Sequence, residues 1–235
     1  MSKLQKIKVG EKKVTIRMNQ SSIYAGKYGT NKDLTLNDEY FDFIHLFNTY
    51  KRYVKSEHTV IEVGASTKSR TKYLSTYCNK LIAVEYFPDR LPKNFNNVYY
   101  IQGDWQRLSK YVNEPVDILV SSHCIEHIYD DLTAINETYS VLKDGGIAII
   151  NTPNRLRLVR SIIELFTGPR KFPYWEHFRE YTKQDLINLI KRSKFKKYTI
   201  EPICFGISPA RFQCIKKCPS FLEKYCIVWE MVLFK

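Results

Sequence analysis

The sequence lacks any long apolar run. No uncharged apolar stretch approaches the ~18 residues that a membrane-spanning helix needs. Its start, MSKLQKIKVGEKKV, also lacks the apolar core of a secretory signal. We therefore expect a cytoplasmic protein without an integral membrane segment.

Cysteine pairs with metal-binding spacing are missing as well. The chain has six cysteines, of which four fall between Cys204 and Cys226, but none forms the C-x₂-C pair that is usual in structural zinc sites. Reduced thiols are the default in a chain without an export signal. The cysteines therefore predict neither a disulfide framework nor a cysteine-bound zinc ion.

Acidic residues are fewer than basic ones, at 24 against 37, and the formal charge is +13. Such a surplus attracts anionic partners, whether RNA, phosphorylated metabolites or acidic lipid headgroups, and selects none of them. A lysine-rich but ordinary solvated surface explains the charge equally well. Basic residues concentrate in the first 20 positions and again in Arg155–Lys171.

Short apolar runs alternate with helical patterns from residue 59 onward. We expect helices at about 67–78 and 130–142, and a further helix opened by Thr182 with Asp185 three positions later. Alternation of this kind predicts an α/β fold with a mostly parallel, Rossmann-like, doubly wound sheet and helices on both faces. The seven expected strands are 59–63, 81–85, 97–101, 116–121, 147–151, 197–205 and 224–234.

The length of 235 residues suits one α/β domain with an elaboration. Residues 1–57 are expected to form an N-terminal extension, with a hairpin over 4–18 and a helix capped by Asn37 or Asp38. Residues 58–235 then form the main domain. Within it, the segment at about 155–181 is rich in aromatic and basic residues and predicts a lid or substrate wall. Residues 221–234 are expected to be a buried last strand rather than a membrane attachment.

Two strands end in carboxylates. The stretch Thr59–Arg70 passes from an apolar run through Glu62 and Gly64 into a helical pattern, and open α/β sheets bind ligands at such a turn. Glu85 ends the next strand, 21 positions after Gly64. A carboxylate at that place can accept hydrogen bonds from both hydroxyls of a ribose. The pattern therefore predicts a ligand that carries a ribose.

Seven short motifs, each weak alone, follow one another in a specific order between about residues 60 and 195. Together the sequence resembles the class I S-adenosylmethionine-dependent methyltransferases. The resemblance implies S-adenosylmethionine as the cofactor and an antiparallel last strand. The motifs are Glu62-x-Gly64, Glu85, Gly103-Asp104-Trp105, Asp117–Ser121, Ile125-Glu126-His127, Leu142–Gly146 and Asn151–Asn154.

The resemblance also implies which residues bind the cofactor. The loop after the first strand would lie under the methionine part, Glu85 would hold the ribose hydroxyls, and Asp104 would accept from the adenine amino group. Trp105 would either cover the adenine face or be a packed loop aromatic. The full implied set is Glu62, Gly64, Ala65, Ser66, Glu85, Tyr86, Asp104, Trp105, Ser121 and Ser122.

One departure from the family concerns the glycine-rich loop, whose pattern is E/D-x-G-x-G-x-G. Here Ser66 and Lys68 stand where the second and third glycines belong, and a side chain has a steric cost where the backbone turns left-handed. Lys68 or Arg70 would offset this by pairing with the methionine carboxylate, unless both are solvated charges at the helix start. The missing glycines also argue against a dinucleotide dehydrogenase, which depends on a close approach to pyrophosphate.

The stretch after the fourth strand contains candidate metal ligands and a candidate base. In ubiquinone-pathway O-methyltransferases and small-RNA 2′-O-methyltransferases the matching E-x-x-E-H supplies ligands to a divalent metal; here His123 replaces the first glutamate, and Glu126 and His127 remain. Two imidazoles and a carboxylate suit a transition metal, whereas metal-free relatives use the same Glu-His pair to close the loop. His123 and His177 are candidate catalytic bases or lid anchors. In-line methyl transfer can also proceed without an essential base.

These residues favour a methyltransferase that acts on oxygen, or less often nitrogen, of a small-molecule, sugar or lipid-linked acceptor. A ring of the acceptor would stack on the expected aromatic wall of Tyr174, Trp175, Phe178 and Tyr181. Methylation of RNA is the alternative enzyme function, favoured by the charge, although the basic residues are scattered. A degenerate, non-catalytic binding module is the third hypothesis.

Overall fold

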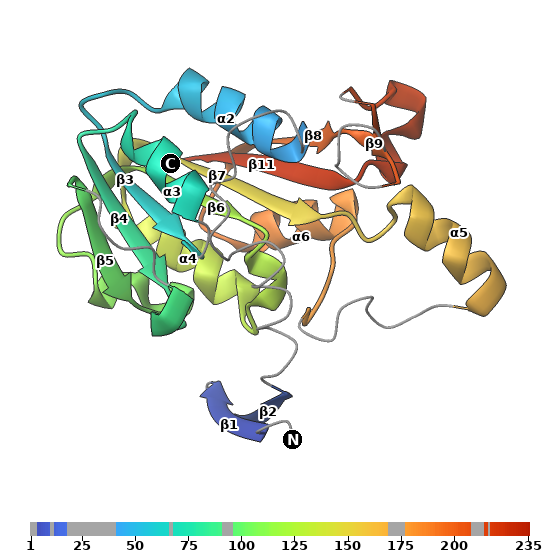
Figure 1. Ribbon diagram of the computed structural model, residues 1–235, viewed down its shortest axis with the longest axis horizontal. Helices are drawn as coiled ribbons and strands as arrows, with labels where there is room; N and C mark the ends of the chain where they lie inside the picture. Colours follow the sequence, from blue (N-terminus) through green and yellow to red (C-terminus); the bar gives the residue numbers. More distant parts are fainter. Residues whose placement is uncertain are drawn as a thin grey trace.

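The computed structural model describes residues 4–9, 12–17, 41–65, 68–90, 96–168, 177–207, 214–215 and 217–235. Its centre is a seven-stranded sheet with the strand order β5-β4-β3-β6-β7-β11-β8 (Figure 1). The strands are β3 (Thr59–Val63), β4 (Lys80–Glu85), β5 (Val98–Gln102), β6 (Val116–Ser122), β7 (Leu142–Pro153), β8 (Lys197–Ile203) and β11 (Val228–Phe234).

The sheet is parallel except for its last strand in the chain. Strands β3 to β7 pair in parallel, whereas β11 lies antiparallel between β7 and β8. Parallel strands are covered on both faces, so they consist of near-continuous apolar residues. β4 illustrates this, because every residue from Leu81 to Glu85 is buried. The predicted fold class is confirmed.

Helices cover both faces of the sheet (Figure 1). On one face α2 (Phe41–Tyr53) and α3 (Lys68–Ser75) pack with Leu46, Leu74 and Val120 in one apolar cluster. On the other face α4 (Asp131–Val141) and α6 (Lys183–Arg192) belong to a larger cluster. The carboxyl ends of β3, β4, β6 and β7 therefore emerge between two layers of helices, where a ligand is expected.

Two helix boundaries test the expected capping. α6 begins with a capping box in which the Thr182 hydroxyl and the Asp185 carboxylate each bond to the other residue's backbone, as predicted. α4 ends at Val141, and β7 begins at the next residue. Gly145 has a φ of 79°, but it lies inside β7. These two glycines therefore lie in a strand and do not cap the preceding helix.

The segment from 155 onward contains structure that the sequence pattern did not predict. It includes α5 (Leu158–Thr167), and residues 224–227 precede β11 instead of belonging to it. The remaining elements are the antiparallel hairpin β1 (Leu4–Val9) and β2 (Lys12–Arg17), the small pair β9 (Phe205–Gly206) and β10 (Cys214–Ile215), and the 3₁₀ helices η1 (Pro88–Arg90), η2 (Trp105–Lys110), η3 (Ile125–His127) and η4 (Ser220–Tyr225).

Three further expectations concern the N-terminal helix, the thiols and the membrane. Asn37 and Asp38, the expected helix caps, lie outside the described residues. None of the five cysteines whose state the structure gives, at 78, 124, 204, 218 and 226, forms a disulfide. Among the described helices, none has the length and apolar character to cross a bilayer.

Candidate active site

Gly64 shapes the turn that leaves β3. Its φ is +73°, a left-handed conformation that side chains disfavour, and a Cβ built on it would lie 2.9 Å from Cys124 Sγ. The amides of Gly64 and Ala65 donate to the Val84 carbonyl at 2.9 and 3.2 Å. The turn is thus fixed against β4, and no residue larger than glycine fits at its first position. Ser66 lies outside the described residues.

Arg70 holds this loop in place through hydrogen bonds. Its Nε donates to Glu62 Oε1 at 2.6 Å, and its Nη2 donates to the Gly64 carbonyl at 2.7 Å. Thr71 Oγ1 donates to the second oxygen of Glu62 at 2.6 Å, and Glu62 and Thr71 are fully buried. Arg70 is 4% exposed, so the expectation of a solvated charge at the helix start was wrong. The guanidinium supports the loop from inside the protein.

Glu85 ends β4 beside this loop and is 6% exposed. Burial raises the pKa of its carboxyl, and the Phe87 N–H, which donates to Oε1 at 3.0 Å, opposes that rise together with Arg90. Tyr86 follows and is 44% exposed, with its ring edge-to-face on Phe87. A buried acceptor next to an exposed aromatic ring suits a ribose that is joined to a flat base.

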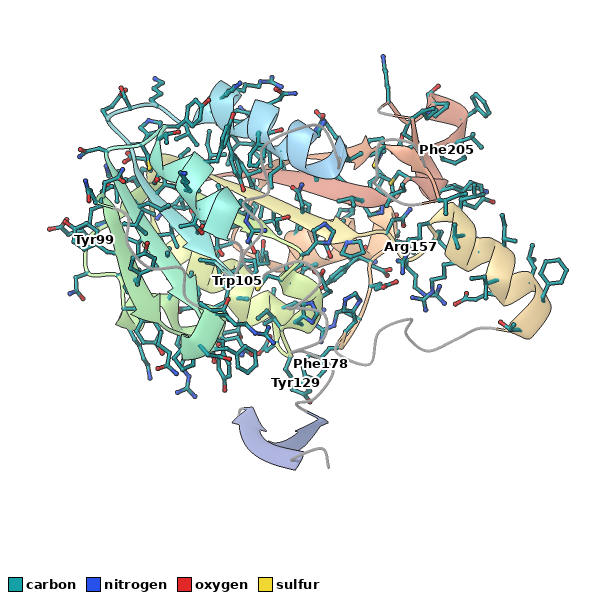
Figure 2. All side chains as sticks on the ribbon, viewed as in Figure 1. Tyr99, Trp105, Tyr129, Arg157, Phe178 and Phe205 are labelled. Atoms are coloured by element: carbon teal, nitrogen blue, oxygen red, sulfur yellow. The ribbon has the colours of Figure 1, made fainter. Side chains whose placement is uncertain are left out.

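Asp104 and Trp105 occupy the loop after β5. Asp104 caps η2, because its Oδ1 accepts from the Gln106 amide at 2.9 Å. Trp105 is 2% exposed, and its Nε1 donates to Thr138 Oγ1 on α4 at 2.9 Å (Figure 2). This geometry favours the packed loop aromatic over a ring that covers adenine. Tyr86, which follows β4, is by contrast an exposed aromatic residue.

Ser121, Ser122 and Asn151 end the neighbouring strands β6 and β7. Both serines are buried, and Ser122 lies opposite Asn151 in the sheet register. Asn151 is 1% exposed, and its side-chain oxygen has no hydrogen-bond partner within the described part of the chain. A buried acceptor of this kind needs a donor, which a bound ligand can supply. Together, Gly64, Glu85 and the Asn151 oxygen place groups that fit S-adenosylmethionine at this edge of the sheet.

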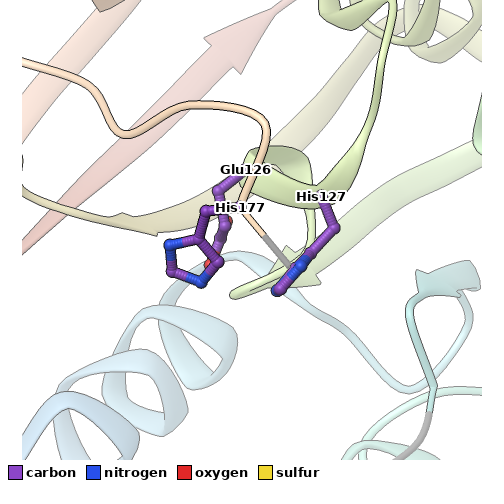
Figure 3. Close-up of side chains that lie close together, drawn as sticks. All are labelled: Glu126, His127 and His177. Atoms are coloured by element: carbon purple, nitrogen blue, oxygen red, sulfur yellow. The ribbon is translucent and has the colours of Figure 1, made fainter. Parts of the chain in front are cut away.

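Glu126, His127 and His177 come together beside the end of β6 (Figure 3). One ligand atom from each lies within 4.8 Å of the other two. Glu126 is 1% exposed; its Oε2 accepts from Thr152 Oγ1 at 3.1 Å, while its Oε1 has no hydrogen-bond partner among the described residues. The Phe178 amide donates to the Glu126 carbonyl at 2.9 Å, which brings the segment from residue 177 back over η3.

A buried ionic network holds His177. Its Nδ1 lies 3.0 Å from Glu180 Oε1, and Arg157 and Arg160 donate to the same carboxylate at 2.9 and 2.5 Å. Burial alone would raise the pKa of Glu180, but the hydrogen bonds from His177 and Arg157 and the two guanidinium charges lower it to about 2. Glu180 is therefore ionised, and Nδ1 of His177 carries the proton that it donates. The other ring nitrogen, Nε2, is then the atom that can accept a proton.

His123 stands at the end of β6 in a strained backbone conformation, with a φ of 52°. Its amide donates to the Asn151 carbonyl at 3.0 Å, and its Nδ1 lies 3.7 Å from Glu126 Oε1. About a third of its side chain, 34%, is exposed. The structure therefore places His123 beside the cluster of Glu126, His127 and His177, and it is His177 rather than His123 that completes the group of three.

The expected aromatic wall is only partly present among the described residues. Tyr181 is 3% exposed and donates to Asp131 Oδ2 at 3.0 Å, so it belongs to the core. Phe178 is half-buried and packs edge-to-face on Tyr129 (Figure 2). Tyr174 and Trp175 lie outside the described residues.

Sequence reasoning did not identify Glu180 and its arginine partners. The segment after residue 155 was expected to be a lid or substrate wall; in the structure its Arg155, Arg157 and Arg160 are paired with Glu164 and Glu180. Glu180 lies 20 and 23 positions from two of these arginines, so no local spacing links them. The cluster of basic and acidic residues on either side of α5 was the available signal.

Comparison with known proteins agrees with this geometry. Residues 61–150 match a family model described as a methyltransferase domain. A probable S-adenosylmethionine-dependent methyltransferase from Mycolicibacterium smegmatis is 30% identical over 82 residues, or 34% of this chain. That match covers 29% of the relative's length.

Solved structures share the fold over most of the chain. The N-methyltransferase NodS from Bradyrhizobium japonicum, in complex with S-adenosyl-L-homocysteine, is 14% identical with a TM-score of 0.58, covering 92% of this chain and 98% of that one. A SAM-dependent methyltransferase from Archaeoglobus fulgidus is 16% identical with a TM-score of 0.61, covering 92% and 99%. The chain thus has the class I methyltransferase fold. More specifically, its residues 61–150 carry a methyltransferase domain.

Proposed function

We propose that this protein transfers the methyl group of S-adenosylmethionine to an oxygen atom of a small-molecule, sugar or lipid-linked acceptor. The single observation that carries the choice of oxygen is the orientation of His177 by Glu180. A neutral hydroxyl loses a proton when it is methylated, so a positioned base accelerates the transfer. The cofactor supplies the electrophilic methyl group on a sulfonium, and the protein aligns the acceptor with it.

The loop and the two strand ends hold the donor in this proposal. Gly64 and Ala65 form the turn under its methionine part, Glu85 accepts from its ribose hydroxyls, and Tyr86 flanks its base. Ser122 and Asn151 border the transferring group. Glu62 acts indirectly, because its buried carboxylate positions Arg70, which in turn holds the Gly64 carbonyl.

His177 is the proposed base, and Glu180 keeps it in the correct tautomer. An ionised carboxylate on Nδ1 fixes the proton there and directs Nε2 to accept one, as in other carboxylate–histidine pairs. Arg157 and Arg160 keep the carboxylate ionised by lowering its pKa. His123 directly follows β6 and is the second candidate for contact with the acceptor.

Labelled cofactor tests this assignment when it is incubated with a metabolite extract and, separately, with total RNA. We expect label in the metabolite fraction. His177→Gln should lower kcat by ~10²- to 10⁴-fold with little change in the KM for the cofactor. His58→Gln is the matched control, because His58 lies just before β3 at the opposite edge of the sheet. Equal turnover in His177→Gln and the parent would show that no base at this position is needed.

Metal-assisted methylation of RNA is the second candidate function. Glu126 favours it, because one of its buried carboxylate oxygens has no hydrogen-bond partner in the described part of the chain and lies beside two imidazoles, which suits a bound transition metal. This function predicts label in RNA that disappears on chelation and in Glu126→Gln. It also predicts that activity returns with Mn²⁺, Co²⁺ or Zn²⁺, whereas the leading proposal predicts turnover that a chelator leaves unchanged.

A further inference from the structure

Helix α5 presents its apolar residues to solvent and its charged residues to the protein. Ile162, Leu165 and Phe166 are exposed by 46%, 81% and 85%. They lie three and four positions apart, on one face of the helix. Arg160 and Glu164 occupy the opposite face. Surface helices normally have the reverse arrangement.

The charged face is held firmly against the body of the protein. Arg160 Nε donates to Glu164 Oε1 at 2.9 Å, and Arg155 Nη2 donates to Glu164 Oε2 at 3.0 Å. Arg160 and Arg157 also bond to the buried Glu180. These ion pairs fix the rotation of the helix about its axis. The outward direction of the apolar face is therefore built into the structure.

The apolar face continues beyond α5 at the same end of the molecule. β9 contacts α5, and the Ile227 amide, two residues after η4, donates to the carbonyl of Cys204, just before β9, at 3.0 Å. Ile207, just after β9, is 67% exposed, and Phe221 in η4 is 81% exposed. We call the five residues Ile162, Leu165, Phe166, Ile207 and Phe221 the apolar end. Contiguous exposed apolar surface of this kind marks an interaction site.

Cations accompany the apolar end. Lys217 and Lys224 are exposed close to Phe221 in the chain, whereas Glu223 is paired with Lys183. Exposed apolar groups flanked by basic residues match the surface of a bilayer with anionic headgroups.

We propose that the apolar end docks on an anionic lipid bilayer, with α5 lying in the plane of the headgroups. A helix of ten residues is roughly 15 Å long, half the thickness of the hydrocarbon core, so it lies on the bilayer and does not span it. A symmetric dimer through the same face would bring the lysines of the two copies together. Like charges at that contact disfavour a second copy as the occupant.

Vesicle sedimentation of the full chain tests this proposal. The parent should pellet with vesicles of equimolar phosphatidylcholine and phosphatidylglycerol and remain in solution with phosphatidylcholine alone. Phe166→Glu should weaken that partitioning about tenfold or more, because it places a charge where apolar area is buried. Tyr99→Glu is the matched control. It replaces an exposed aromatic residue on β5, at the other end of the sheet (Figure 2), and should bind as the parent does.

Three results would overturn the proposal. The first is a parent protein that stays in solution with anionic vesicles, and the second is Phe166→Glu binding equal to that of the parent. The third is a parent dimer in sedimentation velocity that Phe166→Glu dissociates, which would assign the apolar end to a second copy. Circular dichroism of both variants checks that each is folded. The outcome does not depend on methyl transfer, so it separates this inference from the proposed function.

Discussion

The ion pair beneath the cofactor loop offers a sharp test of how this fold replaces the missing glycines. Glu62 has no exposure, and it accepts 2.6 Å hydrogen bonds from both Arg70 and Thr71. Arg70→Met removes the positive charge and leaves the carboxylate buried. Such an uncompensated charge costs about 3–5 kcal/mol of unfolding free energy. In a chain of this length the Tm should fall by roughly 6–20 °C.

A double-mutant cycle followed by urea unfolding isolates the pair. Glu62→Gln combined with Arg70→Met removes both charges, so the double variant should be more stable than Arg70→Met alone by about 2 kcal/mol or more. Lys72→Met is the matched control. Lys72 is exposed on the same helix, and its substitution should change stability by no more than about 0.5 kcal/mol. Two results would refute this reasoning. One is an Arg70→Met variant whose free energy of unfolding lies within about 1 kcal/mol of that of the parent. The other is a double variant that is no more stable than Arg70→Met.

Three further predictions concern stability. Gly64→Ala should cost about 1–3 kcal/mol in urea unfolding, because φ is +73° and the new Cβ would meet Cys124, and parental stability would contradict the geometry. Glu180 has a pKa of about 2 in the folded protein, against an ordinary value of 4.5, so its stabilisation is present above about pH 5 and is lost as the pH falls toward 2. Glu180→Gln should therefore be less stable than the parent at pH 7, and this gap should narrow below about pH 4; a gap independent of pH would be inconsistent. Deletion of residues 221–235 removes β11 from between β7 and β8 and should abolish cooperative unfolding, whereas a folded truncation would show that β11 is dispensable.

The sequence predicted the sheet well because the strands are buried on both faces. The runs at 59–63, 81–85 and 116–121 are short, apolar and bounded by turn residues, so they indicated strands of the kind that the structure contains. The cap of α6 was equally readable, since Thr182 and Asp185 have the spacing of a capping box. Sequence patterns therefore predict an element correctly where the contacts that form it are between residues close together in the chain.

Predictions failed where distant contacts decide the outcome. Arg70 reads as a helix-start charge, yet it is buried because Glu62, eight positions away, is inside the protein. Trp105 was equally compatible with adenine stacking, and only the position of Thr138 on α4 directs its indole into the core. α5 has apolar residues at helical spacing and was missed because its segment was interpreted as a lid or substrate wall; the outward direction of its apolar stripe depends on tertiary contacts that the sequence does not show.

The candidate site was predictable in part. The order of its motifs located the strand ends and the cofactor, because backbone topology brings the carboxyl ends of parallel strands to one edge. The partnership of His177 with Glu180 depends on how the segment from residue 177 returns over η3, and no spacing in the sequence shows it.

Calorimetric titration with S-adenosylhomocysteine tests the central claim most directly, namely that the donor binds at the carboxyl ends of β3 and β4 with its ribose on Glu85. The parent should bind, and Glu85→Gln should bind about 10- to 100-fold more weakly, since it loses hydrogen bonds to a charged acceptor. Glu114→Gln, a substitution at an exposed glutamate, should bind as the parent does. Equal affinity of Glu85→Gln and the parent, or no heat from the parent at millimolar ligand, would contradict the account.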